Sequence, residues 1–418
     1  MNSSPPGLFT ESSDLFRADP MAFLLSQHAQ HGEVFAVELD GAPTVIFGGE
    51  RGPAVLFRAE RDHLGVHNTP LVHELFGRAV FNLAGEHHRQ ARRLLRHAVT
   101  GRPLREMTPA VTALVARHVA QWSELGVFEL RDATRALTLD VCARLILGLP
   151  PGSDDDKQFP GLFTAFVAAA EADSANRDSD PVYQRGLAAA GELRAMVGRR
   201  VAAVDGMPGR EVVSHLVGGG EVSPSDVGDH LLAVMIAARE TTASLLTWML
   251  IEIAQDPDIA QAAADEIDTA GHLDSAAVQA LLWETERRHS PNVLSRRTVI
   301  AELATPYGVI PRGWHAAYSP AANHLLPGLF DDPWRFRPAR FAGHAGVRRA
   351  GGLLTFGQGV HACPGKPFAE LLAVTVMANV LGAHRLTLTG PPPKQVRYLP
   401  VKIPACPVRA VLRPRSRP

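Results

Sequence analysis

One cysteine lies in a segment that could present its thiolate to a large ligand. Cys363 belongs to residues 356–365, which read FGQGVHACPG and include three glycines. Glycine permits positive φ angles and the close approach of other atoms. The apolar residues 371–381 that follow are predicted to form a buried helix. The sulfur is therefore expected just before a helix N-terminus, where the helix dipole favours a thiolate. A lone cysteine is more often an inert core residue, so the other motifs must decide its role.

A basic run at residues 86–93 supplies possible partners for an anionic ligand. The run is predicted to be helical, and His88 and Arg92 are four residues apart, which places them on one face. Cationic donors of this kind pair with buried carboxylates. Taken alone, such a run is more often a solvated helix face.

Glu240 and Thr241 lie midway along a long apolar segment. Ser223 as N-cap and Pro224 at the first position predict a helix start. The helix is expected to reach about Gln255, a length of ~45 Å at 1.5 Å per residue. A carboxylate and a hydroxyl inside so apolar a helix are costly unless they are used. They indicate either a reactive site or a buried salt bridge.

Two further spacings involve arginines. Glu284 and Arg287 are three residues apart and can pair on one helix face. Downstream lies Arg340, within residues 336–341, and Arg297 closes residues 291–297, which begin with proline. Each of these patterns is common by chance when it stands alone.

Together and in this order, the five motifs resemble those of the cytochrome P450 family of haem-thiolate monooxygenases. The similarity runs from about residue 20 to about residue 410, and the pattern Phe-Gly-x-Gly-x-His-x-Cys-x-Gly is its most specific part. The resemblance implies that Cys363 is the proximal ligand of the iron of haem b. It implies that the haem, including its propionates, is contacted by His88, Arg92, Arg297, His361, Phe356 and Ala237.

The resemblance also assigns roles away from the haem edge. Glu240 and Thr241 match the family's acid–threonine pair, which supports proton delivery during oxygen activation. Glu284, Arg287 and Arg340 match a buried network that locks a helix to the cysteine loop.

Two positions depart from the family pattern. Pro364 follows the ligand cysteine and has no N–H group, which predicts one donor fewer to the sulfur and a lower iron potential. Ala238 replaces the usual glycine and is expected to narrow the groove over the iron. A Cys-Pro-Gly loop also resembles the peroxide-using branch of the family, but that branch replaces the acid–threonine pair that this chain keeps.

The implied fold is mainly α with a smaller β region (α+β), with the haem between the long central helix and the cysteine loop. Helices are predicted at residues 20–31, 108–122, 131–149, 185–204 and 275–289, with a hairpin at 34–39 and 44–47 and strands at 309–310 and 316–317. An acidic connection is expected at residues 152–156, loop with short helical pieces at 60–81, and a flexible loop at 218–220. Residues 1–418 are expected to form a single domain, with 1–20 as a loosely ordered N-terminal arm.

Composition narrows the possible partners and location. The chain has 418 residues, 46% of them hydrophobic, and a net charge of −1, which argues against wholesale nucleic-acid binding. Its three cysteines have no paired spacing and predict a reducing compartment. No run reaches the roughly 18 apolar residues of a membrane span, and the N-terminus lacks signal-peptide features. We expect a cytoplasmic monomer of the soluble bacterial type.

The predicted reaction is insertion of one oxygen atom from O₂ into a lipophilic molecule, such as a terpenoid, sterol-like or polyketide intermediate of bacterial secondary metabolism. Electrons would come from NAD(P)H through a ferredoxin reductase and a ferredoxin, with Arg93, Arg96, Arg348, Arg349 and Lys366 as docking contacts. Substrate contacts are expected from residues 66–78, 159–182, 235–237, 293–294 and 398–401. Two alternatives are a peroxide-driven peroxygenase and a non-catalytic haem-binding sensor or helper subunit.

Overall fold

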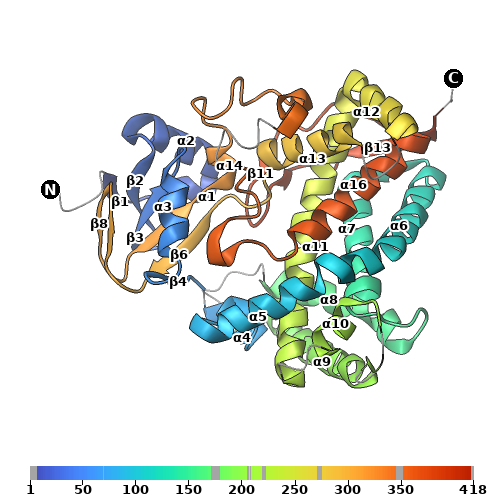
Figure 1. The fold of residues 1–418 in the computed structure, drawn as a ribbon, viewed down its shortest axis with the longest axis horizontal. Helices are drawn as coiled ribbons and strands as arrows, with labels where there is room; N and C mark the ends of the chain where they lie inside the picture. Colours follow the sequence, from blue (N-terminus) through green and yellow to red (C-terminus); the bar gives the residue numbers. More distant parts are fainter. Residues whose placement is uncertain are drawn as a thin grey trace.

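Helix α11 (Pro224–Gln255) runs through the helical half of the molecule (Figure 1). Its start is the predicted one, because the Ser223 hydroxyl accepts the N–H of Asp226 at 3.2 Å. Apolar side chains on every face of the helix are buried, from Leu231 to Ile253. This is the environment expected of a helix that is hydrophobic all round.

The computed structural model describes residues 7–68, 70–170, 179–204, 207, 209–218, 223–270, 275–344 and 352–415. The predicted loop at 218–220 therefore lies outside the described residues, apart from Gly218, which ends helix α10.

Helices surround α11 on several sides, and those that pack against it include α7, α9, α10, α12, α13 and α16. The longer helices are α5 (Gly85–Ala98), α6 (Gly101–Glu124), α7 (Leu130–Val141), α8 (Asp154–Ala170), α9 (Pro181–Val204), α12 (Pro257–Ala270), α13 (Ala276–Arg288) and α16 (Lys366–Ala383). The shorter ones are α4 (Pro70–Phe76), α10 (Val212–Gly218) and α14 (Pro320–Asn323). The main hydrophobic core lies among these helices.

A six-stranded sheet forms the other half of the molecule, with the order β1-β2-β3-β9-β6-β4. Its strands are β1 (Gly7–Glu11), β2 (Val34–Leu39), β3 (Ala42–Phe47), β4 (Leu64–Val66), β6 (Ser295–Val299) and β9 (His315–Tyr318). Helices α1 (Ser13–Ala18), α2 (Pro20–His31) and α3 (Gly52–Ala59) accompany the sheet in Figure 1.

The predicted hairpin is confirmed as β2–β3. Leu39 pairs with Ala42, and the two residues between them, Asp40 and Gly41, have φ angles of 54° and 71°. Two consecutive positive φ angles are what a type I′ turn requires, which is why Asp-Gly suits this position.

Three smaller sheets complete the β structure. One has the order β10-β13-β5, and two are strand pairs, β7–β8 and β11–β12. The strands are β5 (Val127–Glu129), β7 (Leu303–Thr305), β8 (Gly308–Ile310), β10 (His384–Leu388), β11 (Val396–Arg397), β12 (Ile403–Pro404) and β13 (Arg409–Pro414). The predicted strands at 309–310 and 316–317 thus fall in β8 and β9.

Several predicted boundaries differ from the structure. Helix α6 begins at Gly101 rather than residue 108: Pro103 lies in its first turn, where no intrahelical N–H is needed, and the helix continues through Pro109. Helix α7 ends at Val141 and continues as a π-helical turn, Cys142–Ile146. The predicted acidic connection already contains the start of α8. Asp154 lies in the first turn of this helix, where the helix dipole stabilises a negative charge.

The N-terminal segment is more structured than the predicted loose arm. β1 pairs in parallel with β2, and α1 buries Phe16 against Phe23 with ring centroids 6.1 Å apart. Backbone pairing to a sheet edge leaves no simple sequence pattern, which is why it was missed. Residues 1–6 lie outside the described part of the chain.

Two of the described helices are long and apolar enough to cross a membrane by length and composition alone. They are Asp226–Gln255 and Lys366–Ala383, but 72% and 67% of their apolar windows are buried inside the structure. Core helices of a soluble protein have the same properties.

Candidate active site

Two accessible side chains interrupt the burial of α11. From Val227 to Ala254, all of which are described, only Ala237 and Thr241 are exposed. They are one turn apart, and the Thr241 hydroxyl donates to the Ala237 carbonyl at 2.6 Å. An exposed pair in the middle of a core helix marks the wall of a recess. Ala238, by contrast, is partly buried against the main core.

The cysteine loop has a compact backbone that depends on glycine. The Cys363 N–H donates to the Phe356 carbonyl at 2.7 Å, and Gly357 and Gly359 have φ angles of 65° and 69°. A Cβ atom at Gly359 would lie 2.6 Å from Glu60 Oε2. Both the conformation and the close contact therefore exclude a larger residue at Gly359.

The Cys363 side chain is exposed, yet the surrounding protein desolvates it. This combination belongs to a group in the wall of a recess. Burial raises the pKa of the thiol, and the N–H groups of Gly365 and Lys366 and the charge of Arg92 oppose that rise. The N–H groups at the start of α16 thus favour the thiolate, as expected of a helix N-terminus, but desolvation of the sulfur is the larger effect. A coordinating metal ion would deprotonate the thiol.

The N–H groups of Gly365 and Lys366 hydrogen-bond the sulfur. Pro364 itself has no N–H to donate, but the two residues after it both donate their N–H groups to the Cys363 sulfur. The effect of Pro364 on the iron potential stays a prediction.

Histidine and arginine side chains gather beside the cysteine loop. The rings of His88 on α5 and His361 lie 4.5 Å apart, and both are neutral near pH 7. Burial, followed by nearby arginine charges, lowers the pKa of His88 to about 4 and that of His361 to about 3. Burial also lowers the pKa of Arg92, which carries no hydrogen bond or ion pair to the described residues. Arg297 on β6 is a second arginine here, and its side chain is mostly buried.

This donor set fits the haem that the resemblance implies. An accessible thiol can bind iron, and two arginines with two neutral histidines can pair with and hydrogen-bond carboxylates at the porphyrin edge. The Phe356 ring lies in the same loop, with Lys366 Nζ 5.7 Å from its centroid.

A carboxylate that the sequence prediction missed joins this group. Glu60, the C-cap residue of α3, is buried and pairs with Arg297 at 3.0 Å. It also accepts the N–H of His361 at 3.3 Å. Its only sequence signal is weak: an acidic residue at a helix C-cap, where the helix dipole disfavours negative charge.

Glu240 and Thr241 face different surroundings. Glu240 is buried and accepts from Arg135 Nη2 at 2.6 Å, pairs with Arg239, and lies 4.0 Å from Arg131. Both arginines from α7 are distant in sequence, so the motif alone did not indicate them. The structure thus places Thr241 at the recess and Glu240 in an ion-pair cluster beside it.

The structure brings Glu284, Arg287 and Arg340 together. Glu284 Oε1 accepts from Arg287 Nη2 at 2.9 Å and from Arg340 Nε at 3.0 Å, and Glu284 and Arg287 are fully buried. Arg287 also donates to the carbonyls of His324 and Pro333. The network ties α13 to the segment that precedes the cysteine loop.

The possible docking residues are only partly described. Arg93 and Arg96 are exposed on α5, and Arg93 pairs with Glu86 at 3.4 Å. Lys366 lies 3.8 Å from Glu370. Arg348 and Arg349 lie outside the described residues.

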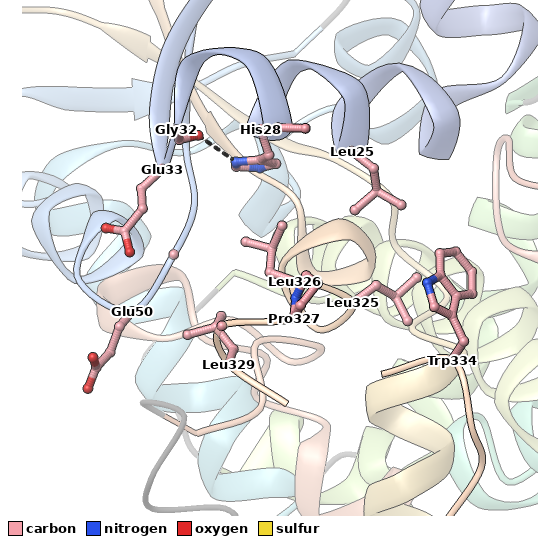
Figure 2. Close-up of a pocket in the computed structure, with 13 residues that line it drawn as sticks. Leu25, His28, Gly32, Glu33, Glu50, Leu325, Leu326, Pro327, Leu329 and Trp334 are labelled. Carbon is pink, nitrogen blue, oxygen red and sulfur yellow. Dashed lines mark hydrogen bonds between the residues drawn. The ribbon is translucent and has the colours of Figure 1, made fainter. Parts of the chain in front are cut away.

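An open groove of about 610 Å³ lies elsewhere, between α2, the turn after β3 and the segment that follows α14 (Figure 2). Its lining includes four leucines and Trp334, with Glu33 and Glu50 at one end. None of the predicted site residues lines it.

Comparison with known proteins agrees with this geometry. The sequence model of the family described as Cytochrome P450 matches residues 12–178 and 212–404. Abscisic acid 8'-hydroxylase 2 of Oryza sativa subsp. indica is 26% identical over 94% of this chain and 82% of its own length. Putative cytochrome P450 136 of Mycobacterium tuberculosis (strain CDC 1551 / Oshkosh) is 27% identical over 88% of this chain and 79% of its own.

A solved structure described as retinoic acid bound cyanobacterial CYP120A1 has the same fold, with a TM-score of 0.87. The match covers 99% of this chain and 100% of that one at 22% identity. The predicted fold, mainly α with a smaller β region, is therefore confirmed. The chain belongs to the cytochrome P450 family, and it is an oxidoreductase of the monooxygenase type.

Proposed function

We propose that the protein is a haem b monooxygenase that inserts one oxygen atom from O₂ into a lipophilic small molecule. The observation that carries the proposal is the accessible but desolvated Cys363 thiol just before α16, with Arg92 close enough to interact with it electrostatically. The haem supplies the oxygen-activating chemistry, and the protein binds, orients and desolvates the reactants.

Each predicted residue has a role in this proposal. Cys363 would hold the haem iron, with the Gly365 and Lys366 N–H groups moderating the charge on sulfur. Arg92, Arg297, His88 and His361 would pair with the propionates, while Phe356 and Ala237 would line the haem. The Thr241 hydroxyl lies at the recess and the buried Glu240 carboxylate is its neighbour in sequence, and both are proposed to support proton transfer.

Electrons are proposed to come from NAD(P)H through a ferredoxin reductase and an acidic ferredoxin. Exposed Arg93 and Arg96 on α5 and Lys366 at the start of α16 provide positive charge near the cysteine loop. Complementary charge of this kind raises association rates more than affinity. The protein is proposed to act in the cytoplasm as a single-domain monomer.

The substrate is proposed to be an isoprenoid, one of the classes that the apolar substrate segments favour. Two similar proteins carry names with abscisic acid and retinoic acid, both of which are isoprenoid carboxylic acids. At 22–26% identity these names support a chemical class rather than a compound.

The test is a titration of the purified ferric protein with isoprenoid acids, steroids, macrolides and fatty acids, followed by the Soret band. A shift from low to high spin with isoprenoids alone, and product formation with NAD(P)H, ferredoxin and reductase, is the expected result. A shift with another class would overturn the substrate proposal. Loss of the thiolate-type ferrous–CO spectrum in the wild type would overturn the assignment of Cys363.

A peroxygenase is the second candidate, favoured by Pro364 directly after Cys363. Turnover with hydrogen peroxide alone, at a rate equal to that with O₂ and the redox partners, would favour it. A protein that binds haem but turns over under neither condition would instead be a sensor or helper subunit.

A further inference from the structure

We propose that Glu60 is a positioning residue that fixes Arg297 and the cysteine loop in the arrangement that holds a haem propionate. The proposal rests on the haem function proposed above. Glu60 lies at the C-terminal end of α3, far in sequence from both groups that it contacts.

One oxygen of Glu60 serves Arg297. Oε1 accepts from Arg297 Nε at 3.1 Å and lies 3.0 Å from Nη2. Arg297 Nη1 donates to the Ser295 hydroxyl at 3.1 Å and the Arg296 carbonyl at 2.9 Å. A guanidinium has five N–H donors, so about one, on Nη2, is left for a propionate. The contacts thus leave Arg297 with a single direction in which to donate.

The other oxygen of Glu60 serves the cysteine loop. Oε2 accepts the N–H of His361 at 3.3 Å, and the Val360 N–H also stabilises the carboxylate. Gly359 makes this approach possible, because a Cβ there would lie 2.6 Å from Oε2 and 3.2 Å from the Phe57 carbonyl. One side chain therefore joins β6, α3 and the loop that carries Cys363.

Burial of the Glu60 carboxylate is costly in free energy. This cost supports a role for the carboxylate in the proposed haem site. Desolvation raises the pKa of Glu60 despite the opposing effects of Arg297 and the two loop N–H groups. The C-terminal end of a helix adds a further unfavourable field. An apolar residue would relieve both costs but would free Arg297 to rotate.

The charge of Glu60 would also lie near the haem edge, because its carboxylate pairs with Arg297 at 3.0 Å. A fixed negative charge there favours the ferric over the ferrous state, because ferric iron carries one more positive charge. If Glu60 served only to pack the segments together, its replacement would leave the reduction potential unchanged. The potential therefore separates a packing role from a role of the Glu60 charge at the haem site.

The experiment compares the wild-type holoprotein with Glu60→Gln and with the control Asp62→Asn, which alters a nearby exposed carboxylate. Haem loss to excess apomyoglobin and the ferric/ferrous midpoint potential are measured. We expect Glu60→Gln to lose haem ~10-fold faster, as removal of a charge-assisted hydrogen bond predicts, and its potential to become more positive. The control should match the wild type in both measurements.

Glu60→Asp and a double-mutant cycle with Arg297→Gln complete the test. Glu60→Asp keeps the charge with a shorter reach, so we expect faster haem loss with a potential near that of the wild type; it also serves if Glu60→Gln does not fold. If Glu60 acts through Arg297, the two substitutions are strongly non-additive. Additive effects, or a Glu60→Gln protein with wild-type haem loss and potential, would overturn the proposal. A wild-type protein without a thiolate-type ferrous–CO spectrum would instead overturn the proposed function.

Discussion

At the scale of single residues, Thr241 and Glu240 show how neighbours in sequence can have separate environments. Thr241 is exposed at the recess and its hydroxyl donates to Ala237 one turn earlier, which leaves its oxygen free to accept. Glu240 is enclosed by arginines from α7 and by Arg239. Thr241 is thus placed to interact with reactants directly, whereas Glu240 must act through movement of its partners or through water.

Replacement of Thr241 by alanine removes the hydroxyl from the recess while leaving the helix intact. We expect product formed per NAD(P)H consumed to fall about tenfold or more, because a side chain positioned in the path of proton transfer contributes at least that much. Thr241→Ser, which keeps the hydroxyl, serves as the matched control and should retain most of the yield. Equal yields from both variants would contradict a role for the hydroxyl.

At the scale of elements, ion pairs connect segments that hydrophobic packing alone would leave loosely related. The buried network joins α13 to the segment before the cysteine loop through Glu284. A second set of polar contacts, centred on Asp229, joins the end of α4 to α9 and α11. Asp229 Oδ2 accepts the Arg78 N–H at 2.8 Å, and Oδ1 accepts from Arg194 Nε at 3.2 Å. Arg194 in turn donates to the Leu75 carbonyl at 2.6 Å.

Glu284→Gln should lower the free energy of unfolding by about 3–5 kcal/mol, because Arg287 and Arg340 then lack their buried counter-charge. Chemical denaturation of the holoprotein measures the change. Glu86→Gln is a suitable control, since Glu86 also pairs with two arginines but is 52% exposed. Its effect should be much smaller, because solvent-exposed ion pairs contribute little to stability. Similar losses in the two variants would contradict the importance of burial.

Asp229→Ala should loosen the segment of residues 66–78, which is predicted to contact substrate. Loss of a charge-assisted contact worth about 1.5–3 kcal/mol should raise the association and dissociation rates of substrate together, by about tenfold. Stopped-flow recording of the Soret shift measures both. Asp226→Asn removes a carboxylate that pairs with the exposed side chain of Arg78 and is expected to change little. Unchanged rates in Asp229→Ala would show that this contact does not control entry.

At the scale of the whole molecule, buried acids make stability depend on pH. Glu286 on α13 is fully buried, and neither of its oxygens has a hydrogen-bond partner in the described structure. Burial, with a smaller contribution from Glu370, raises its pKa to about 8, and Lys366 opposes the rise. Between its ordinary pKa of 4.5 and about 8, the folded protein keeps this proton while the unfolded chain releases it. Rising pH therefore favours unfolding across this window.

Glu286→Gln replaces the titratable carboxyl group by an amide that does not titrate. It should therefore remove the part of the pH dependence of stability that comes from Glu286. From about pH 5 to pH 8, the stability of the wild type relative to the variant should fall by up to about 1.4 kcal/mol per pH unit. Thermal unfolding of both proteins across this range measures the difference. A stability difference that does not change with pH would show that Glu286 is not protonated in the folded protein.

The sequence by itself determined the features that arise from residues close together in the chain. The cysteine loop, the capped start of α11 and the Asp-Gly turn each depend on a few consecutive residues with special backbone or hydrogen-bonding properties. These patterns identified the family and placed the accessible cysteine before α16. They also placed Glu284 and Arg287 on one helix face, because a helix brings residues three apart together.

Only the tertiary structure decided which distant groups meet. Glu60 is 237 residues from Arg297 and 301 from His361, and Arg135 is 105 from Glu240. A lone carboxylate or arginine has the same appearance in the sequence whether it is solvated or buried, since its partner is chosen by the packing of whole elements. The same holds for β1 on β2 and for β3 on β9. The balance of desolvation against hydrogen bonds at Cys363 likewise depends on every neighbour, which no local pattern contains.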